Sequence, residues 1–509
     1  MASTAAADSD PASRNPAPEK PTSRLKSADS GSTSALEQNT PKSPIQAASA
    51  DTPDGESTDV STPGTPGPSV LPPPLCAKYE DSFAYKTVRE RLPVILTRVI
   101  DALFRDRMAI ERRQGSEARE QSRQVVGRLS KLRSDMMTNK PLARITDDYA
   151  DAALWNRAFE EWSELEPPRW FQAPWLYVEC YLYRRIFEAF QLTTLLRDYD
   201  PFAQQKREAL FESLSAIRSL TDFARKNAHS RASLETIRPV ALRLIEVSLW
   251  GNRCDLSLSG GAASNPSGGA LQETQSLRAK ILCNQLTRLW AHLGRMRNRA
   301  SGGIPTQLHL VMDNAGYEMV TDLCLLDYLQ ECGFISRACL HVKAMPWYVS
   351  DVMRRDLYKT LRQLRDLNHE PTSALAQRCL SRLESGAWAA SEDPFWTLPH
   401  DYARMAALAP ELYCSLQEAD LVLFKGDLNY RKLVGDLRWE PSTPFEVALR
   451  GFLPTFLCAL RTIKADTVAG VDADLAREVA HRSPDWMVTG EYALVQCAGR
   501  TLWSRDSEP

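Results

Sequence analysis

The chain has 509 residues, and its 62 Lys and Arg nearly balance its 64 Asp and Glu, which gives a formal charge of −2. This balance provides no electrostatic reason to expect a nucleic acid or an anionic membrane as a partner. Apolar residues make up 43% and charged residues 25% of the chain. Such a composition is typical of a globular protein and excludes a collagen-like, coiled-coil or wholly disordered chain.

Residues 1–75 differ in composition from the rest of the chain. They hold 13 of the 32 prolines and no Phe, Trp, Tyr or Cys. A segment with so little apolar surface cannot offset the entropy cost of ordering its backbone, so we expect a disordered tail that could recruit protein partners. The tail has no signal-peptide core, and no run of 18 apolar residues occurs anywhere in the chain. These features favour a cytoplasmic protein, with the nucleus as a second compartment.

Cysteine and histidine are scattered through the sequence. The eleven cysteines and seven histidines form no CxxC, HxH or HExxH pattern. Scattered cysteines in an odd number are typical of reduced thiols in a reducing compartment. Because no zinc pattern is present, we expect any metal ion to be held by oxygen donors.

The segment that follows the tail is predicted to be helical almost throughout, from residue 80 to residue 300. Apolar residues recur at steps of three and four between residues 92 and 103, which places them on one helix face. A second apolar helix is predicted after Pro174, which suits a first helical position. The string SLSGGAASNPSGG at 257–269 has the chemistry of a flexible insertion. We therefore expect a helical domain over residues 76–300 with an insertion inside it.

After residue 303 the hydrophobic period changes. Short apolar runs at 308–312, 338–342 and 421–424 are each followed by a polar loop, and helical patterns lie between them. Strands that alternate with helices indicate a mainly parallel sheet covered on both faces, so we expect an α/β domain over residues 301–509.

Acidic and amide side chains follow these predicted strands. Asp313, Asn314, Asp351 and Asp427 would all lie at the carboxyl edge of the sheet, where ligands bind in this class of fold. Carboxylate and amide oxygens suit a hard divalent cation such as magnesium or manganese, which can polarise a phosphate. The alternative is that these residues only form an Asx turn and cap a helix.

Cationic side chains follow two of the strands as well. Arg431, a few residues after Gly426, could hold a phosphate through paired hydrogen bonds, and Lys464 could reach it as a point charge. The alternative is that both are solvated loop cations. Together with a metal site, these cations would form a cleft for a phosphoester. The metal and the cations would screen the negative charge of the phosphate, so that water can attack it.

Five stretches of the chain carry motifs: PWLYVECYLYRRIF (174–187), DNAGYEMVTDLCLLDYL (313–329), HVKAMPWYVSDV (341–352), LVLFKGDLNYRKLVGD (421–436) and RTIKAD (461–466). In this order they strongly resemble the damage-control phosphatase family. Within this family, the chain looks most like the eukaryotic branch that carries an RTxK motif. That branch includes fungal sugar phosphate phosphatases and proteins also named acidic residue methyltransferases. The resemblance covers about residues 78–500 and leaves out the tail.

The resemblance implies a three-layer α/β/α sandwich with a mainly parallel sheet and an added N-terminal helical domain. It also implies a metal-dependent phosphatase, which would act on small sugar phosphates such as fructose 1-phosphate and fructose 6-phosphate. The metal would be manganese, cobalt, nickel or magnesium.

By motif match, the metal would be held by Asp313, Asn314 and Asp351. The residues implied to contact the substrate are Asp313, Asn314, Asp427, Leu428, Asn429, Tyr430, Arg431 and Lys464. Glu179 and Arg184 could face the same cleft from the helical domain, and a buried ion pair between packed helices would explain them equally well.

Two catalytic routes and two other functions stay open. Asp351 or Asp427 could accept a proton from a water that attacks phosphorus, or Asp313 could attack and form an aspartyl phosphate. A protein carboxyl methyltransferase that uses S-adenosylmethionine is an alternative function, which the lack of a GxGxxG motif disfavours. The third reading is a non-catalytic scaffold that recruits partners through its tail.

Overall fold

The structure is a computed structural model, and it describes residues 71–163, 166–227, 232–259 and 277–500. Residues 1–70 of the predicted tail and 260–269 of the predicted insertion lie outside the described residues.

The centre of the fold is a seven-stranded sheet with the strand order β1-β7-β6-β5-β2-β3-β4. Only β6 and β7 pair in antiparallel fashion, whereas all other neighbours in the sheet are parallel. The strands are β1 (Ile281–Asn284), β2 (Gln307–Val311), β3 (Arg337–Val342), β4 (Trp388–Glu392), β5 (Leu421–Lys425), β6 (Leu457–Thr462) and β7 (Ala493–Ala498). The predicted α/β class with a mainly parallel sheet is confirmed, and the apolar runs predicted as strands are β2, β3 and β5.

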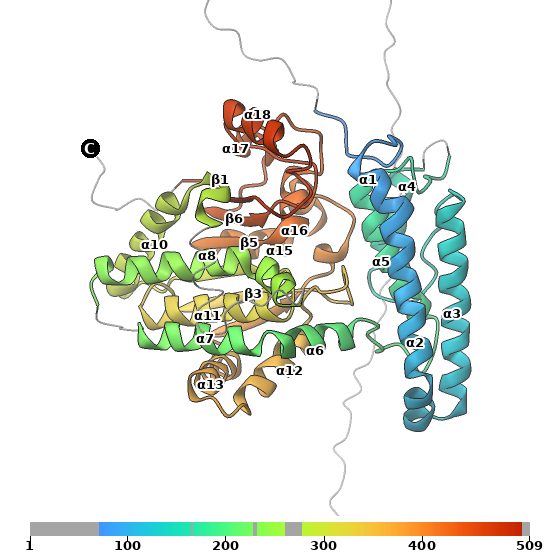
Figure 1. Cartoon of the computed structure of the whole chain (residues 1–509), viewed down its shortest axis with the longest axis horizontal. Helices are drawn as coiled ribbons and strands as arrows, with labels where there is room; N and C mark the ends of the chain where they lie inside the picture. The colour runs from blue at the N-terminus through green and yellow to red at the C-terminus, as the bar shows by residue number, and fades with distance from the viewer. Residues whose placement is uncertain (1–70, 164–165, 228–231, 260–276, 501–509) are drawn as a thin grey trace, which may run out of the picture. The chain divides into compact units, whose positions relative to one another are not determined.

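Helices cover both faces of this sheet (Figure 1). Because side chains alternate along a strand, Leu421 and Leu423 of β5 pack into one hydrophobic cluster, and Val422 and Phe424 pack into the other. The first cluster includes residues of α7, α8, α10, α11, α12 and α13, and the second includes residues of α14 to α18.

The helices of the two layers have the following bounds. Before and between the first strands lie α6 (Ala203–Glu212), α7 (Leu214–Lys226), α8 (Leu234–Ser259), the 3-10 helix η2 (Arg278–Lys280), α10 (Leu286–Ser301), α11 (Tyr317–Glu331), α12 (Arg354–Arg365) and α13 (Glu370–Ser385). After β4 lie the 3-10 helices η3 (Pro394–Thr397) and η4 (Tyr402–Arg404), then α14 (Met405–Leu408), α15 (Pro410–Gln417), α16 (Gly426–Val434), α17 (Phe445–Ala448) and α18 (Ala473–Arg482).

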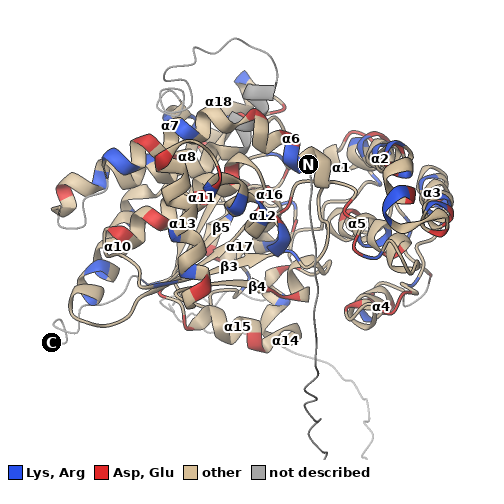
Figure 2. Cartoon of the chain, turned by 90° about the horizontal axis from the view of Figure 1, so that it is seen from below, with Lys and Arg blue, Asp and Glu red and all other residues tan. Residues whose placement is uncertain are grey.

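The first helices of the chain form a bundle of their own. They are α1 (Phe83–Lys86), the π-helix η1 (Thr87–Arg91), α2 (Leu92–Gln114), α3 (Ser116–Met137), α4 (Ala152–Glu161) and α5 (Trp175–Gln191). Basic and acidic residues are interspersed along α2 and α3 (Figure 2). Almost every residue of α5 is buried, because this helix packs against α2 and α3 and also contacts the sheet region.

The three-domain division of the chain stays a prediction. The contacts of the described residues group α7 and α8 with α11, and the strand β1 at 281–284 already belongs to the sheet. The sequence missed β1 because four residues are too few to show a strand period. Within the described ranges, we find no helix whose length and hydropathy would let it cross a lipid bilayer.

Candidate metal and phosphate site

The predicted oxygen donors lie together just beyond the ends of β2 and β3. Asn314 and Asp351 face each other in an isolated antiparallel bridge, and the Val352 N–H donates to the Asp313 carbonyl at 2.9 Å. Asn314 Nδ2 donates to Asp313 Oδ2 at 2.7 Å. The structure therefore brings residues 313, 314 and 351 together at the carboxyl edge of the sheet, and we call these three the oxygen-donor edge.

The amide of Asn314 is fixed from two sides. Its Oδ1 accepts a hydrogen bond from Ser350 Oγ at 2.5 Å, and its Nδ2 also donates to Glu318 Oε2 at 2.8 Å. Glu318 is in turn paired with the buried Lys425, whose Nζ lies 3.2 Å from Glu318 Oε1 and 2.9 Å from Asp322 Oδ1. A buried network of charges thus holds the edge in one geometry.

The carboxylates of the edge are buried close to one another. Asp313 is 9% exposed and Asp351 is 1% exposed. Burial raises the pKa of Asp313 well above its ordinary value, and the neighbouring carboxylates of Glu318 and Asp351 raise it further. Burial raises the pKa of Asp351 to about 6, against the opposing effect of Lys343, whose Nζ lies 3.3 Å from Asp351 Oδ2. Crowded like charges of this kind are what a divalent cation would neutralise.

Gly426 lets the backbone of the β5–α16 turn approach this edge. Its φ is +85°, and a Cβ built there would lie 1.9 Å from Asp313 Oδ2. Only glycine fits both the left-handed backbone and this contact.

The next residue, Asp427, links this turn to the end of β6. Its Oδ1 accepts hydrogen bonds from Arg461 Nε at 2.8 Å and from the Lys464 N–H at 3.0 Å. Arg461 is fully buried and donates as well to the carbonyls of Ala465 and Thr467, at 2.9 and 2.6 Å. The RTxK motif thus fixes the loop that carries Lys464, and it does so through its arginine.

Comparison with known proteins gives a consistent result. Residues 87–479 match the model of the damage-control phosphatase ARMT1-like domain. Curated relatives named Damage-control phosphatase ARMT1 are 41% identical in Danio rerio, 42% in Xenopus laevis and 36% in Homo sapiens. These alignments cover 83–85% of this chain and 97–99% of the relatives. The chain belongs to the damage-control phosphatase ARMT1-like family.

The family membership confirms the resemblance that the motifs carry. A solved DUF89 family protein from Pyrococcus horikoshii is similar over 70% of this chain and 93% of its own, with 14% identity and a TM-score of 0.36. We draw no conclusion from a likeness this weak.

In this family member the side chains of residues 428–431 are engaged in packing. The amide of Asn429 donates to the Lys425 carbonyl at 2.7 Å and accepts from Tyr402 Oη at 2.6 Å. Tyr430 stacks on Phe445, and Leu428 is 6% exposed. Any substrate contact from these three residues would therefore come from their backbone.

Arg431 lies in a buried ion-pair cluster. Its Nε and Nη2 donate to Asp436 at 2.8 and 2.9 Å, its Nη1 donates to Glu179 at 2.6 Å, and its guanidinium lies 3.7 Å from the ring centre of Trp175. A phosphate could reach this guanidinium only by breaking buried ion pairs. The predicted phosphate contact of Arg431 stays untested, and this geometry weighs against it.

The two residues predicted from the helical bundle lie in different places. Glu179 Oε2 accepts from Arg431 and, at 3.1 Å, from Tyr348 Oη. Glu179 therefore contacts the loop that leads to Asp351. Arg184 is fully buried and pairs with Asp147 and Asp151 inside the bundle, at 2.6 and 2.7 Å. The alternative reading, an ion pair between packed elements, describes Arg184.

Sequence reasoning missed several residues at the edge. The predicted donors are contacted by Glu318, Lys343 and Ser350. Each of these residues lies within a motif-bearing stretch: Glu318 follows Asp313 by five residues, and the other two lie within eight residues of Asp351. The spacing of polar residues inside those stretches was the available signal.

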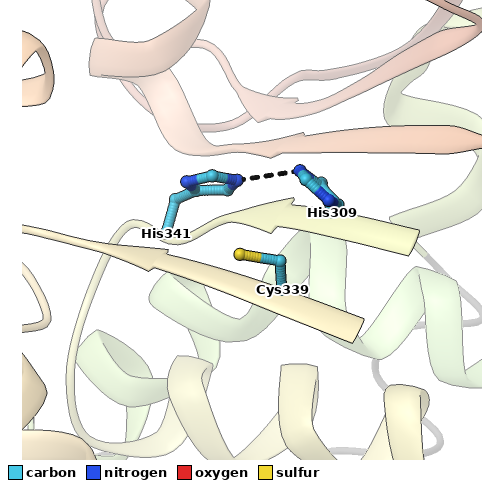
Figure 3. Close-up of side chains that lie close together, drawn as sticks. All are labelled: His309, Cys339 and His341. Carbon is cyan, nitrogen blue, oxygen red and sulfur yellow. Dashed lines mark hydrogen bonds between the residues drawn. The ribbon is translucent and has the colours of Figure 1, made fainter. Parts of the chain in front are cut away.

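The structure also brings together histidine and cysteine side chains that no zinc pattern in the sequence marks. His309, Cys339 and His341 meet on β2 and β3, with one donor atom from each lying within 4.8 Å of the others (Figure 3). Separate strands supply them, so no linear motif reveals the group.

Proposed function

We propose that this protein is a metal-dependent phosphatase that hydrolyses small sugar phosphates such as fructose 1-phosphate and fructose 6-phosphate. The observation that carries the proposal is the meeting of Asp313, Asn314 and Asp351 at one sheet edge. Membership of the damage-control phosphatase ARMT1-like family supports the reaction class.

The donor set fits a divalent ion of the manganese, cobalt, nickel or magnesium kind. Oxygen ligands from two carboxylates and an amide are those such ions accept. Asp351 Oδ2 is buried, makes no hydrogen bond among the described residues and faces the Lys343 ammonium at 3.3 Å, so a bound cation would share this oxygen with Lys343. When bound, the ion would polarise the phosphate and lower the pKa of an attacking water.

The substrate would enter beside the half-buried residues Asn314, Asp427 and Lys464. The N–H groups in the first turn of a helix lack partners within that helix, and α16 begins at Gly426 beside Asp313. These N–H groups and the Lys464 ammonium would bind the phosphate, and the Asp427 carboxylate would accept from a sugar hydroxyl.

Hydrolysis forms a bond between a water oxygen and phosphorus and breaks the bond from phosphorus to the sugar oxygen. Asp351 or Asp427 takes a proton from the water, and the same carboxyl group or solvent then gives a proton to the departing sugar oxygen, which leaves as a neutral alcohol. In the second route Asp313 attacks first, and water then hydrolyses the aspartyl phosphate. Trapping with beryllium fluoride separates the routes, because a beryllium atom bonded to an Asp313 side-chain oxygen would mark the covalent one.

The test of the proposal is phosphate release from a panel of sugar phosphates in the presence of Mn²⁺. The Asp313→Ala variant should lose all metal-dependent release. Asp327→Ala is the matched control, because it removes a buried, Arg-paired aspartate from the far part of α11 and should keep the rate per folded molecule. Full activity of Asp313→Ala would refute the assigned site.

A parallel incubation with labelled S-adenosylmethionine and an acceptor protein tests the methyltransferase reading. Label transfer without phosphate release would overturn the phosphatase proposal.

We also propose a cytoplasmic location for the protein. The described cysteines are free thiols, which supports this location.

A further inference from the structure

Strand pairing brings two imidazoles and a thiol onto one face of the sheet. In the parallel ladder of β2 and β3, His309 lies opposite Cys339, and His341 is the next residue of β3 on the same face. One donor atom from each residue lies within 4.8 Å of the others (Figure 3). This group, the His–Cys–His cluster, contains none of the residues of the oxygen-donor edge.

The cluster is closed to solvent, and one of its polar atoms is unsatisfied. His309 and His341 are each 1% exposed, and Cys339 is 9% exposed. His341 Nε2 and His309 Nδ1 lie 3.0 Å apart and share one proton, whereas His341 Nδ1 is buried with no partner in the described part of the chain. Polar groups in a strand core are costly, so their presence requires a reason.

Both imidazoles are held in the form that binds metal. Burial lowers the pKa of His309 to about 4 and lowers the pKa of His341 well below its ordinary value, so both rings are neutral at pH 7. Burial raises the pKa of the Cys339 thiol to about 11. An ion would therefore displace the thiol proton as it binds, which makes binding weaker at lower pH.

The spacing of the donors is close to what a tetrahedral ion requires. Metal–ligand lengths for zinc imply about 3.3 Å between two ligating nitrogens and about 3.6 Å between a nitrogen and a sulfur. The two facing nitrogens at 3.0 Å need to separate only slightly, and the sulfur needs to move inward.

A supporting group for one ligand is also in place. Gln307 Nε2 lies 2.6 Å from His309 Nε2, the ring nitrogen that does not face His341. If an ion took His309 Nδ1, the proton would reside on Nε2, and the Gln307 amide could accept it after a half-turn of its side chain. Metal-bound histidines usually donate their second nitrogen in this manner.

We infer that His309, Cys339 and His341 form a second metal site, which takes a borderline-soft ion of the zinc class. Imidazole and thiolate donors favour zinc, cobalt(II) or copper(I) over magnesium and manganese. Bound there, the ion would tie β2 to β3 four residues before Asp313 and two residues before Lys343, and would stabilise the strands that carry the oxygen-donor edge.

Cobalt(II) is the probe, because a cobalt–thiolate bond gives a charge-transfer absorption in the near ultraviolet that oxygen ligands do not give. Full-length protein is expressed in zinc-supplemented medium, analysed for metal, and then exchanged with cobalt(II). The wild type should carry close to one zinc and gain the absorption after exchange. Cys339→Ser and His341→Gln should each lose most of the zinc, and Cys339→Ser should lose the absorption.

Two controls make the outcome specific to this cluster. Cys379→Ser removes another fully buried thiol, on α13, and should keep both zinc and absorption. Asp313→Ala should also keep both, so failure of the phosphatase proposal does not affect this test. If the wild type carries no zinc and gives no absorption, the inference is overturned, whether or not a variant folds. If Cys339→Ser keeps the absorption, the inference is overturned as well.

Discussion

Two neighbouring stretches of β2 and β3 offer metal ions opposite kinds of donor. Beyond the strand ends, Asp313, Asn314 and Asp351 present oxygen atoms beside half-buried loops. Inside the same strands, His309, Cys339 and His341 present nitrogen and sulfur within a closed core. The sheet thus separates a position that a substrate could reach from one that is closed to a substrate.

The comparison shows how position in a parallel sheet selects chemistry. Water and phosphate can reach the loops at strand ends. These loops therefore suit hard cations, which keep some of their water ligands when they bind. Strand interiors exclude water, so neutral imidazoles and a thiol are tolerated there where carboxylates are not.

The largest effect is expected from Gly426→Ala. The new Cβ would displace the Asp313 side chain, because it would lie 1.9 Å from Asp313 Oδ2. A displacement of this size should lower Mn²⁺-dependent kcat/KM by about 100-fold or more. The cobalt absorption of the His–Cys–His cluster should not change.

Gly333→Ala is the control for backbone strain. Gly333 has a φ of +75°, and a Cβ there meets nothing within 4 Å. The control should lose about 1 kcal/mol of stability and keep its kcat/KM. Equal loss of activity in the two variants would show that strain, and not contact with Asp313, explains the effect.

A smaller effect is expected from Glu179→Gln. Glu179 holds Tyr348, which has a φ of +42° and is followed by Val349 at +69°, and these strained residues lead directly to Asp351. Weakening the contact should misplace Asp351 and lower kcat/KM about tenfold. Denaturant unfolding should also show a loss of about 3 kcal/mol, because Arg431 loses a buried partner.

Asp147→Asn separates these two effects. Asp147 pairs with Arg184, a buried arginine on α5, and the variant removes the negative charge of this pair. Neither residue contacts the oxygen-donor edge. The variant should cost similar stability and leave kcat/KM unchanged. If both variants lower kcat/KM equally, the contact with Tyr348 has no specific role.

The smallest effect is a pH-dependent change in the stability of metal-free protein. The pKa of Asp313 in the folded state is raised above its unfolded value of 3.8, so its ionisation costs stability as the pH rises from about 4. Asp313→Asn cannot ionise, so it should be more stable than the wild type at pH 7.5 and show no gain near pH 4. Urea unfolding in chelator at several pH values measures this.

The imidazole cluster should show the opposite sign. Because the pKa of His309 is lowered to about 4 in the folded state, the unfolded chain binds more protons between pH 6.5 and 4, and stability falls as the pH falls through this range. His309→Gln should make that slope shallower.

If the stability gained by Asp313→Asn grew towards low pH, that result would contradict the assignment of the oxygen-donor edge.

The sequence predicted the strands that position the edge, because β2, β3 and β5 are continuous apolar runs followed by polar loops. It also placed Asp313, Asn314 and Asp351 at the carboxyl ends of these strands, where the structure brings them together. It did not predict that Arg431 is buried against Asp436 and Glu179, because a helix of mixed residues gives no sign of which face packs. The His–Cys–His cluster was missed because it depends on the register of β2 against β3.

Anomalous diffraction from crystals grown with Mn²⁺, recorded at the manganese absorption edge, tests the central assignment most directly. We predict a peak at coordination distance from the side-chain oxygens of Asp313, Asn314 and Asp351. A fully occupied manganese peak elsewhere, with none between these three residues, would contradict the account.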